Sequence, residues 1–440
     1  MPAWPFTAAK GVWLGGLQGI VAPLGRMAVS CCRPVQARRV DLLDIEGVPM
    51  SAAHRPAPSS GAPNRRIGIL STYPPKLCGL ATFAAALGNE LRRAGNRIDV
   101  VRINDGDETS PISAPVVAEL RNGVPESIRR TAAALSRCDT VIIQHEYGIF
   151  GGDDGEEIIE ILDLIDTPVI VVLHTVPLQP TEHQRSLLID ISERVERVVV
   201  MSDMAREPLH AYAIDQAKVV TIPHGALTPM FERIKDVDLV EDGRPQLLTW
   251  GLLGPGKGIE HVIEALSTIE ESSRPHYTVA GVTHPKVFAR CGDQYRQSLI
   301  DQAEALGVSA WVDFDDTYRD VGQLTRFIAS ATAVVLPYDS RDQVTSGVLV
   351  DAIAAGRPVI ATAFPHAVEM LSNGTGIVVD HDDPVALADA IRRVVDDPQA
   401  LESMGEAARQ LAPTLRWSAV AAQYLRLADE LLDKRERLAI

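Results

Sequence analysis

Runs of consecutive valine and isoleucine constrain the fold of this chain more than any other sequence feature. Segments such as "IDVVRI", "DTVIIQHE" and "TPVIVVLHT" lack the alternation of apolar and polar residues that a half-exposed strand shows. Continuous apolar strands are covered on both faces, which is typical of parallel sheets between two layers of helices. Helical segments such as "GEEIIEILDLI" separate most of these strands. We therefore predict a doubly wound α/β architecture.

The series of strand, loop and helix occurs twice along the chain. "PQLLTWG" begins a second series that continues through "HYTVAGVTH", "AVVLPYDS" and "RPVIATAF". The 440 residues also exceed the roughly 250 to 300 at which a single core stops growing. We predict four regions: an extension and linker at 1–64, a Rossmann-like domain at 65–225, a second Rossmann-like domain at 226–415, and a C-terminal helix at 416–440 that packs back across the domains.

Residues 1–64 do not have the composition of a folded domain. "SAAHRPAPSSGAP" is a linker rich in proline, serine and alanine, and the apolar stretch at 11–24 is short and interrupted by glycine and proline. We interpret this region as an unstructured or mis-assigned extension, with a signal peptide as the weaker alternative. Met50 is an alternative start.

Charge and cysteine content exclude several classes of function. The net charge of −16 argues against nucleic acid as the main partner, because phosphate binding needs an excess of lysine and arginine. The five cysteines include no C-x-x-C pair, which indicates a reducing compartment and no zinc site. We expect a cytoplasmic protein. The moderately basic helix predicted at 121–137 leaves peripheral contact with the inner face of a membrane as an alternative.

A glycine-rich loop follows the first strand of the second series. In "GLLGPGKGIE", Gly254 and Gly256 permit a tight turn, and Lys257 arrives where a helix is about to begin. A lysine beside free helix amides suits a diphosphate. The alternative is a flexible loop with a solvated lysine. The loop is not a P-loop, because Gly258 follows the lysine where that motif has serine or threonine.

The stretch "RDQVTSGVLVDAIAAG" places small residues where a strand gives way to a helix. Ser346 and Gly347 let an anion approach backbone amides at the start of that helix. Asp351 follows within the first two turns and Gln343 precedes the helix, so both could bind vicinal hydroxyls of a sugar or a ribose. The alternative is that Asp351 only complements the helix dipole.

Two further groups of polar residues stand at predicted strand ends. His145, His174 and His224 each follow a strand of the first domain, and their spacing does not specify a metal site. In "AFPHAVEML", His366 and Glu369 open a helix of the second domain. The Glu369 carboxylate could face a substrate hydroxyl or cap its own helix.

Taken in order, these motifs resemble the retaining glycosyltransferases of the GT-B fold, the group one or family four type. The resemblance covers roughly residues 65 to 425, and its pieces include "YPPKLCGLATF", "VVLHT", "IPHG", "GLLGPGKGIE" and "DAIAAGRPVIAT". It implies two Rossmann-like domains that face a central cleft. A nucleoside diphosphate sugar would lie in that cleft and the first domain would bind the acceptor. It implies no metal and no cofactor beyond the donor.

Matching by position assigns roles in the second domain. Lys257 would contact the donor diphosphate, Asp351 the ribose and Gln343 the donor sugar. The other implied donor-binding residues of this domain are Gly254, Ser346, Gly347, His366 and Glu369.

In the first domain, the resemblance implies that His174 contacts the reacting sugar from the opposite wall. Gly79 would let its loop approach the donor, and His145 and Glu146 would lie on the acceptor side. The implied catalytic residues are His174, Lys257 and Gln343.

The chain departs from the family pattern at three places. The family commonly has arginine where this chain has Leu252, and glutamate at both Gln343 and Asp351. The usual pair of glycines before the glutamate on the sugar side is replaced by His366 and Ala367. These departures bear on the donor more than on the fold.

The implied reaction transfers a glycosyl group, with a hexose such as mannose favoured, to an acceptor hydroxyl of a glycan, lipid or small molecule. Alternatives are another GT-B enzyme, such as a nucleotide-sugar epimerase or a sugar phosphorylase, and a catalytically impaired binding protein. Asp105 and Asp107 have the D-x-D spacing of metal-dependent transferases, but we interpret them as a solvated loop.

Overall fold

The computed structural model describes residues 64–76, 78–104, 111–226, 243–317 and 319–438. Residues 1–63 of the predicted extension and linker, and the pair Asp105 and Asp107, lie outside these residues. The described residues belong to one compact unit. Within it the chain builds two separate parallel sheets, which confirms the predicted fold class.

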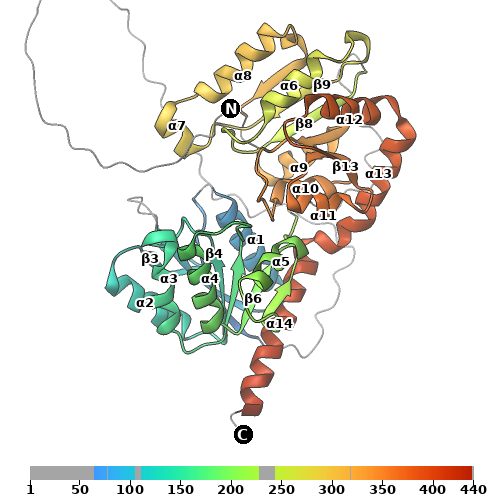
Figure 1. The fold of residues 1–440 in the computed structure, drawn as a ribbon. Coiled ribbons are helices and arrows are strands. Elements are labelled where there is room, and N and C mark those ends of the chain that lie inside the picture. Colours follow the sequence, from blue (N-terminus) through green and yellow to red (C-terminus); the bar gives the residue numbers. More distant parts are fainter. Residues whose placement is uncertain (1–63, 77, 105–110, 227–242, 318, 439–440) are drawn as a thin grey trace, which may run out of the picture. The chain divides into compact units, whose positions relative to one another are not determined.

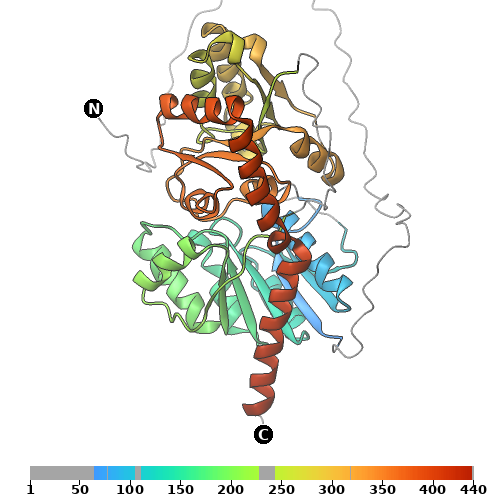
Figure 2. The same cartoon turned by 90° about the vertical axis from the view of Figure 1, so that its right-hand side faces the viewer.

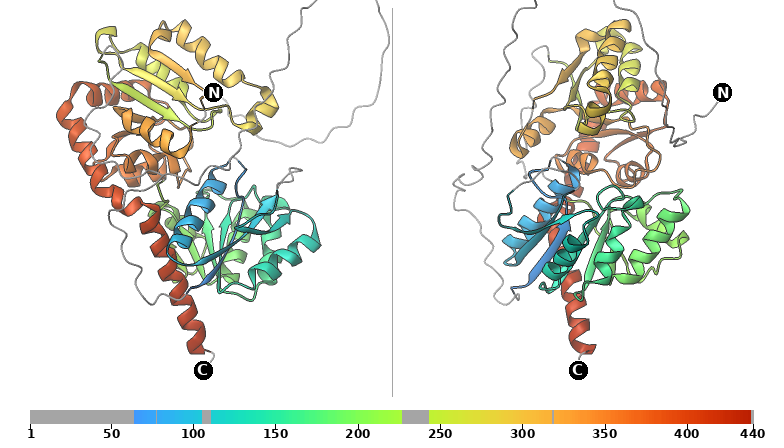
Figure 3. Two further views of the ribbon diagram at one scale, coloured as in Figure 1. Left: turned by 180° about the vertical axis from the view of Figure 1, so that it is seen from behind. Right: turned by 90° about the vertical axis from the view of Figure 1, so that its left-hand side faces the viewer.

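The first sheet has seven parallel strands in the order β3-β2-β1-β4-β5-β6-β7, with helices on both of its faces (Figures 1 and 3). Its strands are β1 (Arg66–Ser71), β2 (Arg97–Asn104), β3 (Val116–Arg121), β4 (Thr140–His145), β5 (Val169–Leu173), β6 (Arg197–Val200) and β7 (Val219–Thr221). The helices between them are α1 (Gly79–Arg93), α2 (Pro125–Leu135), α3 (Glu157–Asp163), α4 (Glu182–Arg194) and α5 (Asp203–Ala211).

The second sheet has six parallel strands in the order β10-β9-β8-β11-β12-β13. Its strands are β8 (Gln246–Trp250), β9 (His276–Ala280), β10 (Val312–Asp315), β11 (Ala333–Leu336), β12 (Val359–Thr362) and β13 (Gly376–Val379). The helices of this half are α6 (Ile259–Ser267), α7 (Pro285–Cys291), α8 (Gln294–Ala305), α9 (Val321–Ser330), α10 (Gly347–Ala354), α11 (Pro365–Leu371), α12 (Pro384–Asp396) and α13 (Pro398–Leu411), and α14 (Trp417–Leu438) ends the described chain.

Each sheet separates two hydrophobic clusters, which explains the continuous apolar runs in the sequence. In β1, Leu70 packs into the cluster that contains residues of α2, α3 and α4. Ile67 and Ile69 pack into the other cluster, with residues of α1 and α14. Because successive side chains of a strand point to opposite faces, a strand covered on both sides must be apolar at nearly every position.

The edge strand β3 was not predicted from the sequence. It pairs only with β2, with an irregular register near Val100 and Val101, and its side chains alternate irregularly between buried and exposed. An edge strand needs fewer apolar residues than a central one, so its signal in the sequence is weak. Helix α2 consequently begins at Pro125 rather than at residue 121. In the part of the chain that the structure describes, every helix is too short or too polar to cross a membrane.

The C-terminal helix α14 packs against α1, although about 340 residues separate them (Figure 2). At its start, the Trp417 ring meets the Phe83 ring edge-on, with the ring centroids 4.7 Å apart. The chain enters and leaves the second half at adjacent points, because the Ala226 amide donates to the Leu415 carbonyl oxygen at 2.6 Å. Trp417 also covers Gly225, where a Cβ atom would lie 2.3 Å from the indole.

We expect Gly225→Ala to lower the free energy of unfolding by about 1–3 kcal/mol, because the added methyl group must displace Trp417. Gly148→Ala is the matched control, since a Cβ atom there would have no neighbour within 4 Å. The control should change stability by less than about 0.5 kcal/mol. Urea unfolding of both variants measures the difference. Equal stabilities would show that Trp417 is not packed on Gly225 as described.

Candidate functional site

The glycine-rich loop of the second half joins β8 to α6 at the carboxyl end of the sheet, the edge where open parallel sheets bind ligands. Lys257 immediately precedes Gly258, which is the N-cap of α6 and has a positive φ of 64°. A Cβ atom at Gly258 would lie 1.7 Å from the carbonyl oxygen of Pro337. Only glycine therefore lets the loop lie against the end of β11. The sequence interpretation stressed Gly254 and Gly256 and missed this position, although "GKG" contains it.

The Lys257 amine lies over the ring of Tyr338, 4.4 Å from its centroid. Burial lowers the pKa of Lys257. Among the described residues, no carboxylate forms an ion pair with this amine, so the ring face is its main electrostatic partner. A partly buried cation without an anionic neighbour is a favourable site for a phosphate group. Tyr338 is buried, and sequence reasoning did not single it out.

The small turn before α10 meets Lys257 at the same tyrosine. Tyr338 forms a side-chain hydrogen bond with Ser346. The Ser346 hydroxyl caps α10 by accepting from the Leu349 amide at 3.3 Å. The Ser346 amide is already used, because it donates to Nδ1 of His366 at 2.8 Å. The next two amides, of Gly347 and Val348, have no acceptor among the residues that the structure describes.

Gly347 also makes room for a neighbouring side chain. A Cβ atom there would lie 3.1 Å from Cε1 and Nε2 of His224, which comes from the first half of the chain. Glycine at this position thus permits both an open helix start and close packing of an imidazole. The sequence had suggested only the first reason.

The polar residues on either side of this turn are both half-buried. The Gln343 side chain folds back and donates from Nε2 to the Thr345 carbonyl oxygen at 3.1 Å. The backbone carbonyl oxygen of Gln343 accepts from the His366 amide at 3.2 Å. Asp351 lies in the second turn of α10. Gln343 and His366 therefore brace one another, and Asp351 lies on the adjoining helix.

Glu369 has a partner that the sequence did not suggest. Its two carboxylate oxygens accept from the amides of Asp203 and Met204, at 3.1 and 2.9 Å. These amides begin α5 of the first half, so Glu369 caps α5 rather than its own helix. Of the two sequence interpretations, capping of its own helix is not what the structure shows.

The histidines at the strand ends of the first half are all neutral near pH 7. Burial lowers the pKa of His174 to about 3, with further contributions from His224 and His145. Burial also lowers the pKa of His224 and of His145 to about 4. Nε2 of His174 lies 2.6 Å from Oε1 of Gln144, and the Phe83 ring contacts both His174 and His224 edge-on. These two histidines are brought together, and His145 is fully buried.

His145 and Glu146 have different environments, although they are adjacent. Both ring nitrogens of His145 are buried without a hydrogen-bond partner among the described residues. The Glu146 carboxylate accepts from the Thr175 hydroxyl at 2.6 Å and from the Tyr147 amide at 3.0 Å, and burial raises its pKa. Glu146 is therefore the more accessible of the two. At Gly79, the first residue of α1, a Cβ atom would meet no atom within 4 Å, so the space in front of it is open.

One group of side chains within the described ranges has the spacing of metal ligands. It consists of His261, Asp339 and Asp382, whose candidate ligand atoms lie within 4.8 Å of one another. Nε2 of His261 lies 3.4 Å from an oxygen of Asp339, and Arg341 pairs with Asp382 at 3.2 Å. Both carboxylates are exposed, so an ion-pair network accounts for the group.

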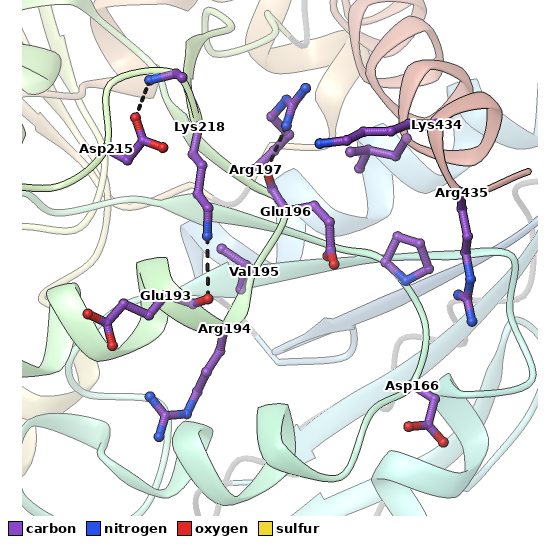
Figure 4. A pocket seen from close by; sticks show the side chains of 13 residues that line it. Asp166, Glu193, Arg194, Val195, Glu196, Arg197, Asp215, Lys218, Lys434 and Arg435 are labelled. Atoms are coloured by element: carbon purple, nitrogen blue, oxygen red, sulfur yellow. Dashed lines mark hydrogen bonds between the residues drawn. The ribbon is translucent and has the colours of Figure 1, made fainter. Parts of the chain in front are cut away.

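An open pocket elsewhere in the described chain does not have the character of an active site. It lies at the amino ends of β5, β6 and β7, beside the last turns of α14 (Figure 4). One of its two lysines has an internal function, because Lys218 donates to the carbonyl oxygens of Ser192 and Glu193 at the end of α4. Because the motifs gather at the carboxyl ends of the strands, we place the functional site there.

Comparison with known proteins identifies the family to which both halves of the chain are similar. Residues 230–411 match the family model described as "Glycosyl transferases group 1", and residues 78–226 match "Glycosyltransferase Family 4". The D-inositol 3-phosphate glycosyltransferase of Corynebacterium glutamicum is 29% identical over 234 residues, which cover 51% of this chain and 54% of that protein. The alpha-D-kanosaminyltransferase of Streptomyces kanamyceticus is 26% identical over 285 residues, covering 59% and 69%. This chain thus spans about half the length of several of the curated relatives that it matches.

Solved structures share the fold at low sequence identity. Sucrose-phosphate synthase from Thermosynechococcus elongatus has a TM-score of 0.66 and 19% identity, with 84% of this chain and all of that chain covered. Anabaena HepE, solved with UDP-glucose, has a TM-score of 0.65 and 16% identity over the same shares. With two parallel Rossmann-like sheets and family matches in both halves, the chain belongs to the group 1 glycosyltransferases of the GT-B fold.

We expect Gly258→Ala to destabilise the protein by more than about 2 kcal/mol, because it combines a positive φ with a collision against the backbone of Pro337. Gly256→Ala is the control: it shares the positive φ, at 90°, but its Cβ atom would meet nothing within 4 Å. Its cost should be about 1–2 kcal/mol. Chemical denaturation compares the two. Losses of the same size would mean that the approach to Pro337 is not a tight constraint.

Proposed function

We propose that this protein transfers a glycosyl group from a nucleoside diphosphate sugar to an acceptor hydroxyl. The observation that carries the proposal is the meeting of Lys257 and the start of α10 at Tyr338. A cation with no carboxylate partner and two amides with no acceptor among the described residues provide complementary donors for two phosphate groups. Family membership supports this use, since two related solved structures hold UDP or UDP-glucose.

In this proposal, catalysis depends on stabilising the leaving group. The bond between the anomeric carbon and the diphosphate oxygen breaks, and Lys257 with the amides of Gly347 and Val348 stabilises the negative charge that develops. The acceptor oxygen forms the new bond to the anomeric carbon, and its proton passes to the Glu146 carboxylate. We propose retention of the anomeric configuration and a hexose donor, because the motif order is that of retaining enzymes.

The remaining residues then have distinct tasks. Asp351 binds the ribose, and Gln343 binds the donor sugar from the adjoining loop. His174 is neutral, so it acts on the sugar as a hydrogen-bonding group rather than as a cation. The Glu146 carboxylate lies on the acceptor side, where its raised pKa suits an exchange of protons with a hydroxyl. No metal is assigned a task, since Lys257 supplies the positive charge.

Lys257→Ala should weaken binding of the nucleoside diphosphate by about 1.5–3 kcal/mol, the usual value for a hydrogen bond to a charged group. Lys286→Ala removes an exposed lysine of α7 and serves as the control, with no expected change. Calorimetry with UDP and GDP, with and without EDTA, measures the effect. Binding that EDTA abolishes while Lys257→Ala leaves it intact would contradict the metal-independent site.

Asp351→Ala and Gln343→Ala should have separable effects, because they lie on opposite sides of the turn. Asp351→Ala should weaken the nucleoside diphosphate and the intact donor alike, by about 1–3 kcal/mol. Gln343→Ala should leave nucleoside diphosphate binding unchanged and lower turnover, since its partner is the sugar. Calorimetry and initial rates distinguish the two. The assignment fails if Gln343→Ala costs as much nucleoside diphosphate affinity as Asp351→Ala.

A further inference from the structure

The amino terminus of α5 contacts two separate segments of the proposed donor site. Ser202, the residue before α5, donates its hydroxyl to the Val344 carbonyl oxygen at 2.7 Å. The next two amides, of Asp203 and Met204, donate to the two carboxylate oxygens of Glu369. Three hydrogen-bond donors at one helix start in the first half therefore hold a loop and a helix of the second half.

The loop is held by the side chain of Val344 as well as by the carbonyl oxygen of that residue. Val344 is only 2% exposed, and it belongs to a hydrophobic cluster whose other buried members all lie between residues 70 and 219. Its neighbours along the chain are Gln343 and, two residues on, Ser346. Burial of Val344 in the core of the first half thus fixes the backbone that carries Gln343 and Ser346, two residues proposed to bind the donor.

Helix α11 is held by the Glu369 carboxylate, which lies at the amino terminus of α5. A carboxylate at a helix amino terminus meets unpaired amides and the positive end of the helix dipole. Glu369 lies on α11, the same helix that carries His366, and His366 accepts the hydrogen bond of the Ser346 amide. Any movement of α11 away from α5 would therefore reach the turn at Ser346.

We infer that Ser202 and Glu369 are positioning residues, through which α5 holds the 343–346 segment and α11 in the arrangement that the sugar end of the donor requires. The inference rests on the proposed function. It also gives Glu369 a task other than direct contact with the donor, since both of its oxygens are occupied by backbone amides.

We call the three hydrogen bonds from the start of α5 to Val344 and Glu369 the clamp. The two ends of the donor should respond differently to its loss. Lys257, proposed for the diphosphate, lies in the loop before α6, and Asp351, proposed for the ribose, lies in the second turn of α10. The three hydrogen bonds from the start of α5 go to Val344 and Glu369 instead. Gln343 and His366 are next to the clamped positions. Loss of the clamp should thus lower turnover and leave nucleoside diphosphate binding unchanged.

The first test replaces Glu369 with glutamine in the full chain. Glutamine keeps one acceptor oxygen for one of the two amides. Its NH2 group is a donor and cannot accept a hydrogen bond from the other. We expect the amides of Asp203 and Met204 to exchange hydrogen at least about tenfold faster, and turnover to fall about tenfold. The affinity for UDP or GDP should stay within about twofold of the wild type. Glu207→Gln, an exposed position on α5 with the same change of charge, is the matched control.

The second test uses Ser202, which also caps α5 by accepting from the Ala205 amide at 3.1 Å. Ser202→Ala removes both the cap and the bond to Val344, so it should lower stability as well as turnover. Ser202→Thr keeps a hydroxyl for both bonds and should restore turnover. Rescue by threonine, with nucleoside diphosphate affinity unchanged throughout, supports the positioning role.

Two results would overturn the inference. In the first, Glu369→Gln shows the same amide exchange rates and the same turnover as the Glu207→Gln control. The other is a loss of nucleoside diphosphate affinity that parallels the loss of turnover, which would place Glu369 at the donor itself. If the wild-type protein binds no nucleotide sugar, the proposed function fails; hydrogen exchange at Asp203 and Met204 then supports or overturns the clamp without it.

Discussion

The close approach of Gly258 to the carbonyl oxygen of Pro337 is the constraint on which the proposed site depends. It brings the loop after β8 against the end of β11, so that Lys257 lies over Tyr338, the residue that forms a hydrogen bond with Ser346 at the start of α10. A side chain at this position would force the loop away from Pro337, because its Cβ atom would lie 1.7 Å from the carbonyl oxygen. The lysine would then lose the ring that partly compensates for its burial.

The second constraint joins the two halves of the chain. Val344 is buried in the core of the first half, His224 packs against Gly347, and Glu369 binds the start of α5. The turn before α10 is therefore shaped from both sides. This differs from the nucleotide end of the proposed site, whose residues come from the second half alone.

Electrostatics at the site differ from those of the chain as a whole. The net charge is −16, yet the groups that we assign to the donor diphosphate are a lysine and two backbone amides, and the nearby histidines are neutral. The histidines are kept neutral by burial, so they can donate or accept hydrogen bonds without adding charge. Binding of an anionic donor to an acidic protein thus depends on a few local groups, and Lys257 is the cation that we assign to it.

The sequence by itself determined the two sheets, the glycine loop and the turn at residues 345–347, because apolar runs and small residues at strand ends are local signals. It could not show β3, since an edge strand carries few apolar residues. It also pointed to Lys257 but not to Tyr338, to Gly254 and Gly256 but not to Gly258, and to a carboxylate at Glu369 but not to its partner. Each of these depends on atoms that are distant in the chain: Gly258 on Pro337, 79 residues later, and Glu369 on amides 165 and 166 residues earlier. Only the tertiary structure decided them, because a steric limit or a hydrogen bond between remote segments leaves no periodic pattern in the sequence.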